Sequence, residues 1–357
     1  MSSNNNLRRL AKQDNMSIFM VLLFIILAVF LVEFLVVRDG NLSKVAFVKP
    51  MNISNVFMQI STTGILAISM TLIMISGGID LSVGQMMCFI GVLMAYLLRN
   101  AGFSELGMVL TGATVAVLFG LLMGFIISRT KLEPFIVSLG FMTIYKGFTY
   151  LITNGSEITI TGKFTFIGQT YVNLSDQFRI GLPVFLFISL TIIMWLALKY
   201  TKFGRRVYAV GGNENAAYLA GINVKNFKLL LYGLNGLFVA IAAMVLMSRT
   251  GVGGPLMGEG KEIDVIAAVV VGGTALSGGK GNIWGTFIGV LLLGCISNAL
   301  NILGVSPHWQ YIMRGVLIIA AVLLSYLSGL RSSSVVVEDR KKQAAEIEDT
   351  SARASVQ

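Results

Sequence analysis

The sequence predicts an all-α, polytopic membrane protein with about ten transmembrane helices. Hydrophobic residues make up 55% of the 357 residues and charged residues only 12%, against roughly 25% charged in a typical soluble domain. Several apolar stretches run for about 18 residues or more, which is the length a helix needs to cross the hydrocarbon core of a bilayer. These stretches are continuous rather than alternating, so helices are expected and a membrane β-barrel is not.

Apolar windows place ten candidate spans along the chain. The third and eighth are short and flank glycine-rich segments, which makes them candidates for partly re-entrant helices. Residues 1–17 then form an N-terminal arm, 18–330 the transmembrane domain and 331–357 a charged tail. The expected spans are 18–37, 56–76, 85–98, 106–128, 134–152, 181–198, 229–248, 263–277, 283–304 and 309–328.

The distribution of positive charge predicts the orientation of these spans. Cytoplasmic loops of membrane proteins carry an excess of Lys and Arg, and the excess here falls on the two termini and on the loop 200–228. Both termini are therefore expected in the cytoplasm. The formal charge of +10 is spread over many loops, so it is better explained by topology than by nucleic-acid binding.

A glycine-rich octapeptide occurs twice, flanked by apolar runs both times. Gly77–Gly84 (GGIDLSVG) matches Gly272–Gly279 (GGTALSGG), and Phe89–Leu93 returns intact as Phe287–Leu291. Paired interruptions of membrane helices in two halves of a chain indicate a transport pathway. The polar and glycine residues expected to form this pathway or its gate are Gly77, Gly78, Asp80, Ser82, Gly84, Gly272, Gly273, Ser277, Gly278, Gly279, Asn298 and Asn301.

Asp80 has two interpretations. A carboxylate inside a span is costly and usually faces protein or water, so Asp80 could contact a solute. Alternatively, Asp80 and Ser82 cap the helix that restarts after the glycines, by accepting its free backbone N–H groups; this second interpretation is preferred. Asn298 and Asn301, three residues apart on one helical face, are similarly explained by hydrogen bonds between helices.

The loop 200–228 contains one segment with helix signals. Asn213 is a suitable N-cap, Glu214 complements the positive end of the helix, and Gly221 supplies a stop. From the residues alone, this is an ordinary loop helix or a rigid element that contacts a soluble partner.

Four segments of the chain resemble the ribose-type sugar ABC-transporter permeases of bacteria. They are TLIMISGGIDLSVG from Thr71, Asn154–Ser156, FGRRVYAVGGNENAAYLAGINV from Phe203 and DVIAAVVVGGTALSGGKG from Asp264, and the resemblance covers residues 50–328. It implies an inner-membrane importer subunit for a monosaccharide or similar small polyol. It also implies three partners: a cytoplasmic ATPase, an extracytoplasmic sugar-binding protein, and a second permease subunit that is an identical chain or a close paralogue. The residues implied to contact the ATPase are Gly212, Asn213, Glu214, Ala216, Ala217 and Gly221.

The chain is not expected to be an enzyme or to hold a cofactor or metal. A phosphate-binding loop needs G-x-x-x-x-G-K-[ST], but Lys280 is followed by Gly281 and the preceding glycines are wrongly spaced. With one histidine and two cysteines, a metal cluster has no support. The alternative function is a gradient-driven secondary transporter of a small polar solute. It would need an acidic or histidine relay at mid-membrane, for which Asp80 is the best candidate.

Overall fold

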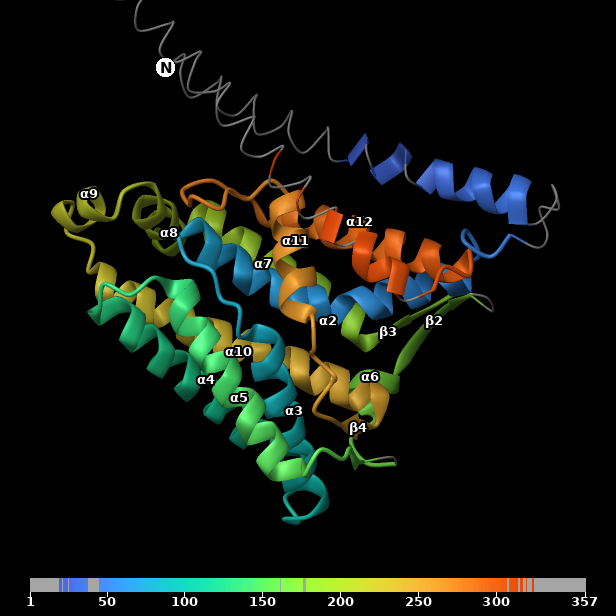
Figure 1. Cartoon of the computed structure of the whole chain (residues 1–357), viewed down its shortest axis with the longest axis horizontal. Coiled ribbons are helices and arrows are strands. Elements are labelled where there is room, and N and C mark those ends of the chain that lie inside the picture. The colour runs from blue at the N-terminus through green and yellow to red at the C-terminus, as the bar shows by residue number, and fades with distance from the viewer. Residues whose placement is uncertain are drawn as a thin grey trace, which may run out of the picture.

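The structure is a computed structural model that describes residues 19–37 except 21 and 25, 45–306 except 161, 176 and 177, and 308–313, 315–316, 319 and 323. The expected N-terminal arm and C-terminal tail lie outside these residues, as does part of the last expected span. Most of the described chain is helical (Figure 1).

Among the described residues, six helices are long and apolar enough to cross a membrane. They are α2 (Pro50–Ile75), α4 (Glu105–Arg129), α5 (Pro134–Thr153), α7 (Leu182–Tyr200), α10 (Val224–Thr250) and α12 (Ile283–Ile302). Each lies within a few residues of an expected span. Two further expected spans are helices too short for this group: α3 (Val83–Arg99) extends slightly beyond its expected span, and α11 (Lys261–Val271) is shorter than expected. An apolar helix at Leu22–Leu35 ends in the π-helix η1 (Glu33–Val37).

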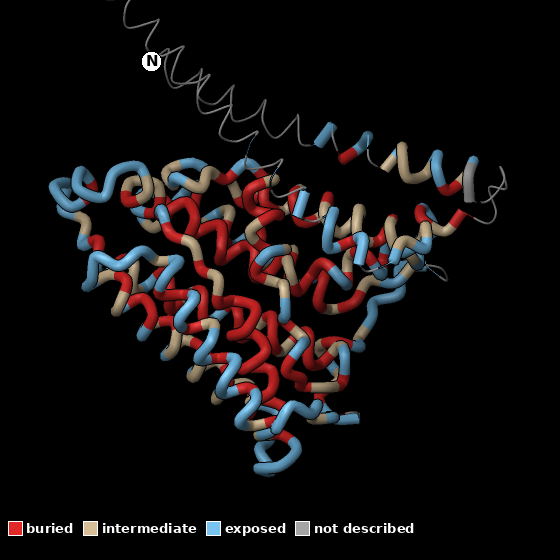
Figure 2. The backbone as a smooth tube through the Cα atoms, viewed as in Figure 1, coloured by how far each residue is buried: buried red, intermediate tan, exposed pale blue. Residues whose placement is uncertain are grey.

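The helices divide into an inner and an outer set, as the burial pattern in Figure 2 shows. The most apolar stretch of α2 is 83% buried and that of α10 is 67% buried, whereas the values for α4, α5 and α7 are 33%, 22% and 33%. α2 packs against α7, α10, α11 and α12. Because the outer helices expose apolar side chains such as Leu118 and Ile193, these faces suit contact with lipid.

A non-helical segment, a short strand followed by turns, leads from α10 into the bundle and ends where α11 begins. Its first part, β4 (Val252–Gly253), lies against Gly91 and Ala95 of α3, and Gly258 lies against Gly84 at the start of α3. At 1.5 Å of rise per residue, these contacts are roughly 10 Å apart along α3. α11 therefore starts part-way along the bundle rather than at its end.

Four short strands modify the all-α expectation. β1 (Ile158–Thr159) pairs with β4, and β2 (Tyr171–Ser175) pairs with β3 (Phe178–Gly181), both antiparallel. α6 (Phe166–Gln169) lies between them, where a polar loop was expected. Ser248 of α10 fixes this region, because its Oγ accepts from the Gly168 N–H at 2.8 Å and donates to the Phe164 carbonyl at 2.6 Å.

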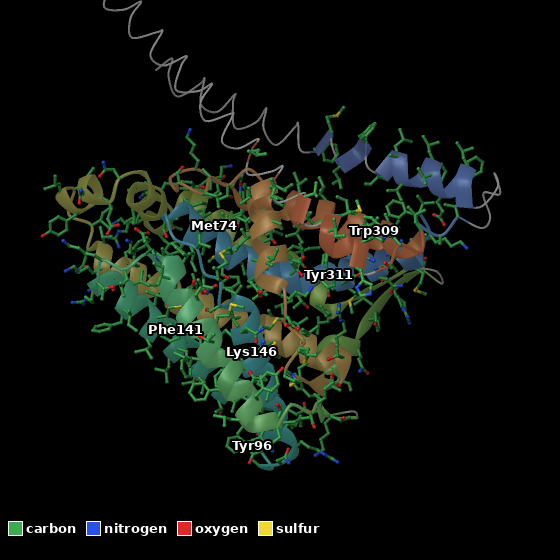
Figure 3. The ribbon with its side chains drawn as sticks, in the orientation of Figure 1. Met74, Tyr96, Phe141, Lys146, Trp309 and Tyr311 are labelled. Atoms are coloured by element: carbon green, nitrogen blue, oxygen red, sulfur yellow. The ribbon has the colours of Figure 1, made fainter. Side chains whose placement is uncertain are left out.

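Exposed aromatic side chains lie near helix ends, as Figure 3 shows for Tyr96, Trp309 and Tyr311. Tyr96 is close to the C-terminal end of α3, and Trp309 and Tyr311 follow α12; they are 41%, 60% and 68% exposed. Trp and Tyr are enriched where a membrane meets water, so these positions are consistent with spans that end there.

Candidate functional site

The two glycine-rich repeats end their helices with the same backbone geometry. After α2, the Gly78 N–H bonds the Ile73 carbonyl at 3.0 Å and Gly77 is left-handed, with φ of 87°. After α11, the Thr274 N–H bonds the Val269 carbonyl at 3.1 Å and Gly273 has φ of 85°. Both ends are Schellman motifs, in which a left-handed glycine lets the chain leave the helix.

The backbone geometry aligns the two repeats with an offset of one residue from the sequence match. The octapeptides align Gly77 with Gly272, but the structure makes Gly77 equivalent to Gly273, because these two carry the left-handed turn. Gly78 then corresponds to Thr274 rather than to Gly273. The second repeat also continues further before its next helix, since α3 begins at Val83 and α12 only at Ile283.

The two repeats lie against each other. The Gly279 N–H donates to the carbonyl of Ile75, the last residue of α2, at 2.8 Å. A Cβ on Gly278 would lie 2.9 Å from the Gly77 Cα, closer than side chains approach backbone. The second repeat therefore supplies a hydrogen-bond donor to the C-terminal end of α2, where helix carbonyls lack partners of their own.

A further helix, α8 (Lys202–Gly212), completes this contact. A Cβ on Gly211 would overlap the Ile75 carbonyl oxygen and lie 2.8 Å from the Gly279 nitrogen. One turn earlier, the Tyr208 hydroxyl donates to the Gly281 carbonyl at 2.9 Å. We call Gly77, Gly211, Gly278 and Gly279 the glycine junction, because at these positions three segments meet backbone against backbone.

Asp80 is fully buried and bound by protein groups. Its Oδ1 accepts from the Ser82 N–H at 2.8 Å and the Ser82 hydroxyl at 2.6 Å, and its Oδ2 accepts from Asn235 Nδ2 at 2.7 Å. Asn235 in turn accepts from the Ser69 hydroxyl at 2.7 Å. Asp80 thus binds the N–H of Ser82, the residue before α3 begins, rather than a free N–H of the first turn as the capping interpretation expects, and through Asn235 it is connected to α10 and α2. Ser82 is the N-cap residue of α3 but makes no capping bond with its own side chain.

Gly84 is a packing residue between α3 and the segment that leads to α11. A Cβ there would overlap the Gly258 carbonyl and the carboxylate of Glu262. Glu262 is 7% exposed, and its Oε2 has no hydrogen-bond partner among the described residues. A larger residue than glycine at position 84 would push α11 away from α3.

The two asparagines of α12 make separate hydrogen bonds between segments. Asn298 pairs reciprocally with Asn52 of α2, at 3.0 and 2.8 Å, and Asn301 accepts from Gln310 Nε2 at 2.8 Å. These bonds match the interhelical interpretation of both residues. In the second repeat, Ser277 and Gly273 are exposed, and Gly272 is buried against Gly285 and Thr286 of α12.

The segment expected to contact an ATPase forms a second short helix, α9 (Glu214–Leu219). The capping prediction is confirmed, because Asn213 Oδ1 accepts from the Ala216 N–H at 2.9 Å and Gly221 is left-handed with φ of 84°. Glu214 bonds Lys228 of α10 at 2.6 Å. Ala217 faces inward, and Gly212, Asn213, Glu214, Ala216 and Gly221 are exposed. The amphipathic helix α8 was not expected as a separate element.

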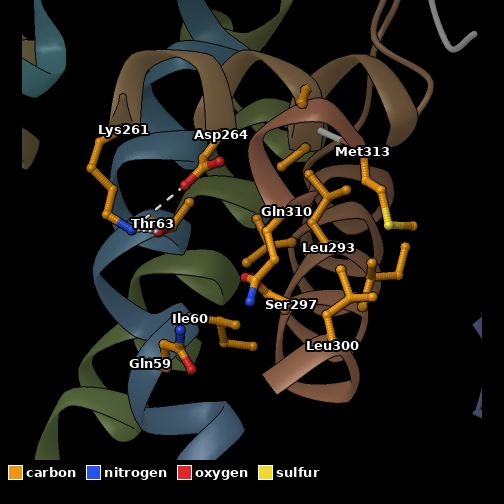
Figure 4. Close-up of a pocket in the computed structure, with 15 residues that line it drawn as sticks. Gln59, Ile60, Thr63, Lys261, Asp264, Leu293, Ser297, Leu300, Gln310 and Met313 are labelled. Carbon is orange, nitrogen blue, oxygen red and sulfur yellow. Dashed lines mark hydrogen bonds and ion pairs between the residues drawn. The ribbon is translucent and has the colours of Figure 1, made fainter. Parts of the chain in front are cut away.

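A small pocket of about 70 Å³ lies between α2, α11 and α12 (Figure 4). Its polar side chains come from three helices and the segment after α12: Gln59, Thr63, Lys261, Asp264, Ser297 and Gln310. Lys261 Nζ is 3.4 Å from Thr63 Oγ1 and 3.6 Å from Asp264 Oδ2. Lys261 precedes the expected span 263–277, so the hydrophobic pattern did not predict that it lines a pocket.

Among the described residues, no group of three His, Cys, Asp or Glu side chains could hold a metal ion. Cys88 and Cys295 are both free thiols.

Residues 52–322 match the family of permease components of branched-chain amino acid transport systems. The chain belongs to this permease family. The ribose import permease protein of Bacillus subtilis is 39% identical over 83% of this chain and 91% of its own length. The ribose import permease protein of Escherichia coli K12 is 37% identical over 76% of this chain and 85% of its own length. The fructose import permease protein of Rhizobium meliloti is 35% identical over 84% of this chain and 83% of its own length. The permease is therefore a multi-pass membrane subunit of an importer, and in this family ATP is hydrolysed by a separate subunit. This membership excludes the gradient-driven alternative.

Proposed function

We propose that this permease forms the membrane pathway of an ATP-driven importer for a monosaccharide and receives the force for transport through α9. The observation that carries the coupling role is the exposed apolar tip of α9. Tyr218 is 70% exposed and Leu219 is 84% exposed, on a capped helix that Glu214 holds to α10. Exposed apolar side chains on a rigid element suit a protein interface.

The sugar assignment is supported by the relatives. The family description names branched-chain amino acids, whereas the relatives at 35–39% identity are permeases for ribose, allose and fructose. Because these relatives match nearly the whole membrane domain, a monosaccharide is the better supported solute. An extracytoplasmic sugar-binding protein would deliver it, with the strands around residues 158–181 as the candidate docking surface.

The proposal includes ten spans, two cytoplasmic termini and a pair of permease subunits. Six described helices of spanning length support it. α3 also supports it, and so does α11 taken together with the non-helical segment 252–260 that precedes it. α8 and α9 lie at one corner of the molecule and the strands lie at the far side (Figure 1), which is consistent with opposite faces of a membrane. The glycine junction and Asp80 would then lie toward the cytoplasmic half, as framework for a gate.

The coupling role is tested by assembly of the purified permease in nanodiscs with the ATPase subunit encoded beside it. Leu219→Asp, which places a charge on the exposed tip of α9, should reduce ATPase capture at least tenfold, because one buried Leu contributes about 1.5–3 kcal/mol. Leu106→Asp, at a similarly exposed position outside α9, should assemble as the wild type does. Equal capture by both variants would remove α9 from the interface.

A further inference from the structure

The pocket between α2, α11 and α12 lies about halfway along the bundle. Thr63, on its wall, is close to the middle of α2, which runs from Pro50 to Ile75. Lys261 is the first residue of α11 and reaches Thr63. α11 is a short helix preceded by a non-helical segment, and in transporters such discontinuous helices place their ends at solute sites near mid-membrane.

The pocket contains two charged side chains, Lys261 and Asp264, about halfway along the bundle. Lys261 and Asp264 are 27% and 17% exposed, and a charged residue at the centre of a membrane is costly. Their mutual contact reduces this cost and leaves the pocket with no net charge. Ionisable residues held inside a membrane domain characteristically mark a solute pathway.

The pocket is lined by hydrogen-bond donors, hydrogen-bond acceptors and apolar side chains. Lys261 and the amide of Gln59 offer donors, while Asp264, the hydroxyl of Thr63 and the side-chain carbonyl of Gln310 offer acceptors. Ile60, Leu293, Leu300 and Met313 line the same pocket (Figure 4). A sugar has hydroxyl groups around its edge and C–H groups on its faces, so a neutral pocket with both kinds of lining is complementary to it.

We infer that this pocket is a solute-contact site on the import path and that it takes a neutral polyhydroxyl compound of monosaccharide size. The site rests on the proposed function, because it is useful only in a permease that moves such a solute. Thr63, Lys261 and Asp264 form its polar centre, and Gln59 lies at its exposed edge. The Gln59 side chain makes no hydrogen bond to another described residue, so it can be replaced without breaking a contact.

Solute contact is tested first by protection from thiol labelling. Gln59→Cys is introduced into the full chain carrying Cys88→Ala and Cys295→Ala, in complex with the ATPase. Its labelling by a small methanethiosulfonate reagent is timed with D-ribose, D-fructose or L-leucine. A sugar should slow labelling at least threefold. Asn173→Cys, in the exposed strand β2, is the matched control outside both the pocket and α9, and should label at one rate throughout.

Transport is tested second, in proteoliposomes that also hold the ATPase and the binding protein. Gln59→Leu and Thr63→Val should each lower ATP-dependent uptake of D-ribose about fivefold to tenfold, equivalent to one lost hydrogen bond. Thr191→Val is the control: Thr191 is buried in α7, away from the pocket, and bonds the Phe187 carbonyl at 2.8 Å. It should transport as the wild type does.

The outcomes separate the site from the proposed function. If the wild type transports D-ribose but no sugar protects Gln59→Cys and both pocket variants transport normally, the site is wrong and the function stands. If L-leucine protects and the sugars do not, the assignment to polyhydroxyl solutes is wrong. A wild type with no ATP-dependent sugar uptake contradicts the proposed function itself.

Discussion

At the scale of single residues, Asp80 shows how a buried carboxylate can serve the fold rather than a solute. Both of its oxygens are occupied, by Ser82 and by Asn235, and its exposure is zero. These partners belong to the start of α3 and to the inner helix α10. Asp80 therefore ties the end of the first repeat to the core of the bundle, and a solute could reach it only if these bonds were broken.

Replacing Asn235 tests this structural role. Asn235→Leu would leave Asp80 Oδ2 without its donor, whereas the Ser69 hydroxyl would keep the Leu66 carbonyl as acceptor. Removing one partner of a buried charged group costs roughly 1.5–3 kcal/mol, so the detergent-solubilised variant should melt at a clearly lower temperature. The control is Asn173→Ala, in the exposed strand β2, which should melt as the wild type does. Equal melting temperatures would mean that the network contributes nothing to stability.

At the scale of elements, the glycine junction connects α8 and α9 to both repeats. α8 touches the end of α2 through Gly211 and the second repeat through Tyr208, and α9 follows α8 after Asn213. No flexible side chain lies between the backbones of Gly211 and Ile75. A displacement of α9 would consequently be transmitted through α8 to both repeats, because backbone contacts join these segments directly.

Adjacent glycines provide a matched test of this connection. Gly211→Ala would force its Cβ into the Ile75 carbonyl, whereas a Cβ on Gly212 would meet no atom within 4 Å. Gly211→Ala should reduce the amount of sugar imported per ATP hydrolysed by at least tenfold. Gly212→Ala should leave this ratio within twofold of the wild type.

Tyr208→Phe is the milder companion variant, because it removes only the hydroxyl that bonds Gly281. It should keep assembly with the ATPase and the melting temperature close to those of the wild type, and lower the same ratio by a smaller factor. If both Gly211→Ala and Tyr208→Phe transport with the wild-type ratio, the junction does not transmit the movement.

At the scale of the whole molecule, the sequence predicted most of the long helices because length and hydrophobicity determine them. The expected spans 106–128, 134–152 and 283–304 differ by at most two residues from α4, α5 and α12. The capped helix after Asn213 could also be predicted, since capping is local chemistry. The match to a permease family confirms the class of function that the motifs indicated.

What the sequence did not reveal depends on contacts between distant segments. The expected span 263–277 corresponds to the helix Lys261–Val271, which a non-helical segment precedes. This segment is recognised only from its packing against α3. The shift between the two repeats depends on which glycine is left-handed. The pocket is lined by residues from α2, α11 and α12, and no local sequence pattern predicts that these three helices come together.

The most direct test of the central claim is the energy source of sugar uptake. Proteoliposomes holding the permease, its ATPase and its binding protein are loaded with ATP, and entry of radiolabelled D-ribose is measured with and without the ATPase and with ion gradients collapsed by ionophores. The proposed function predicts uptake that needs both ATP and the ATPase and is insensitive to ionophores. Uptake that continues without the ATPase and stops when the ion gradient collapses would contradict it.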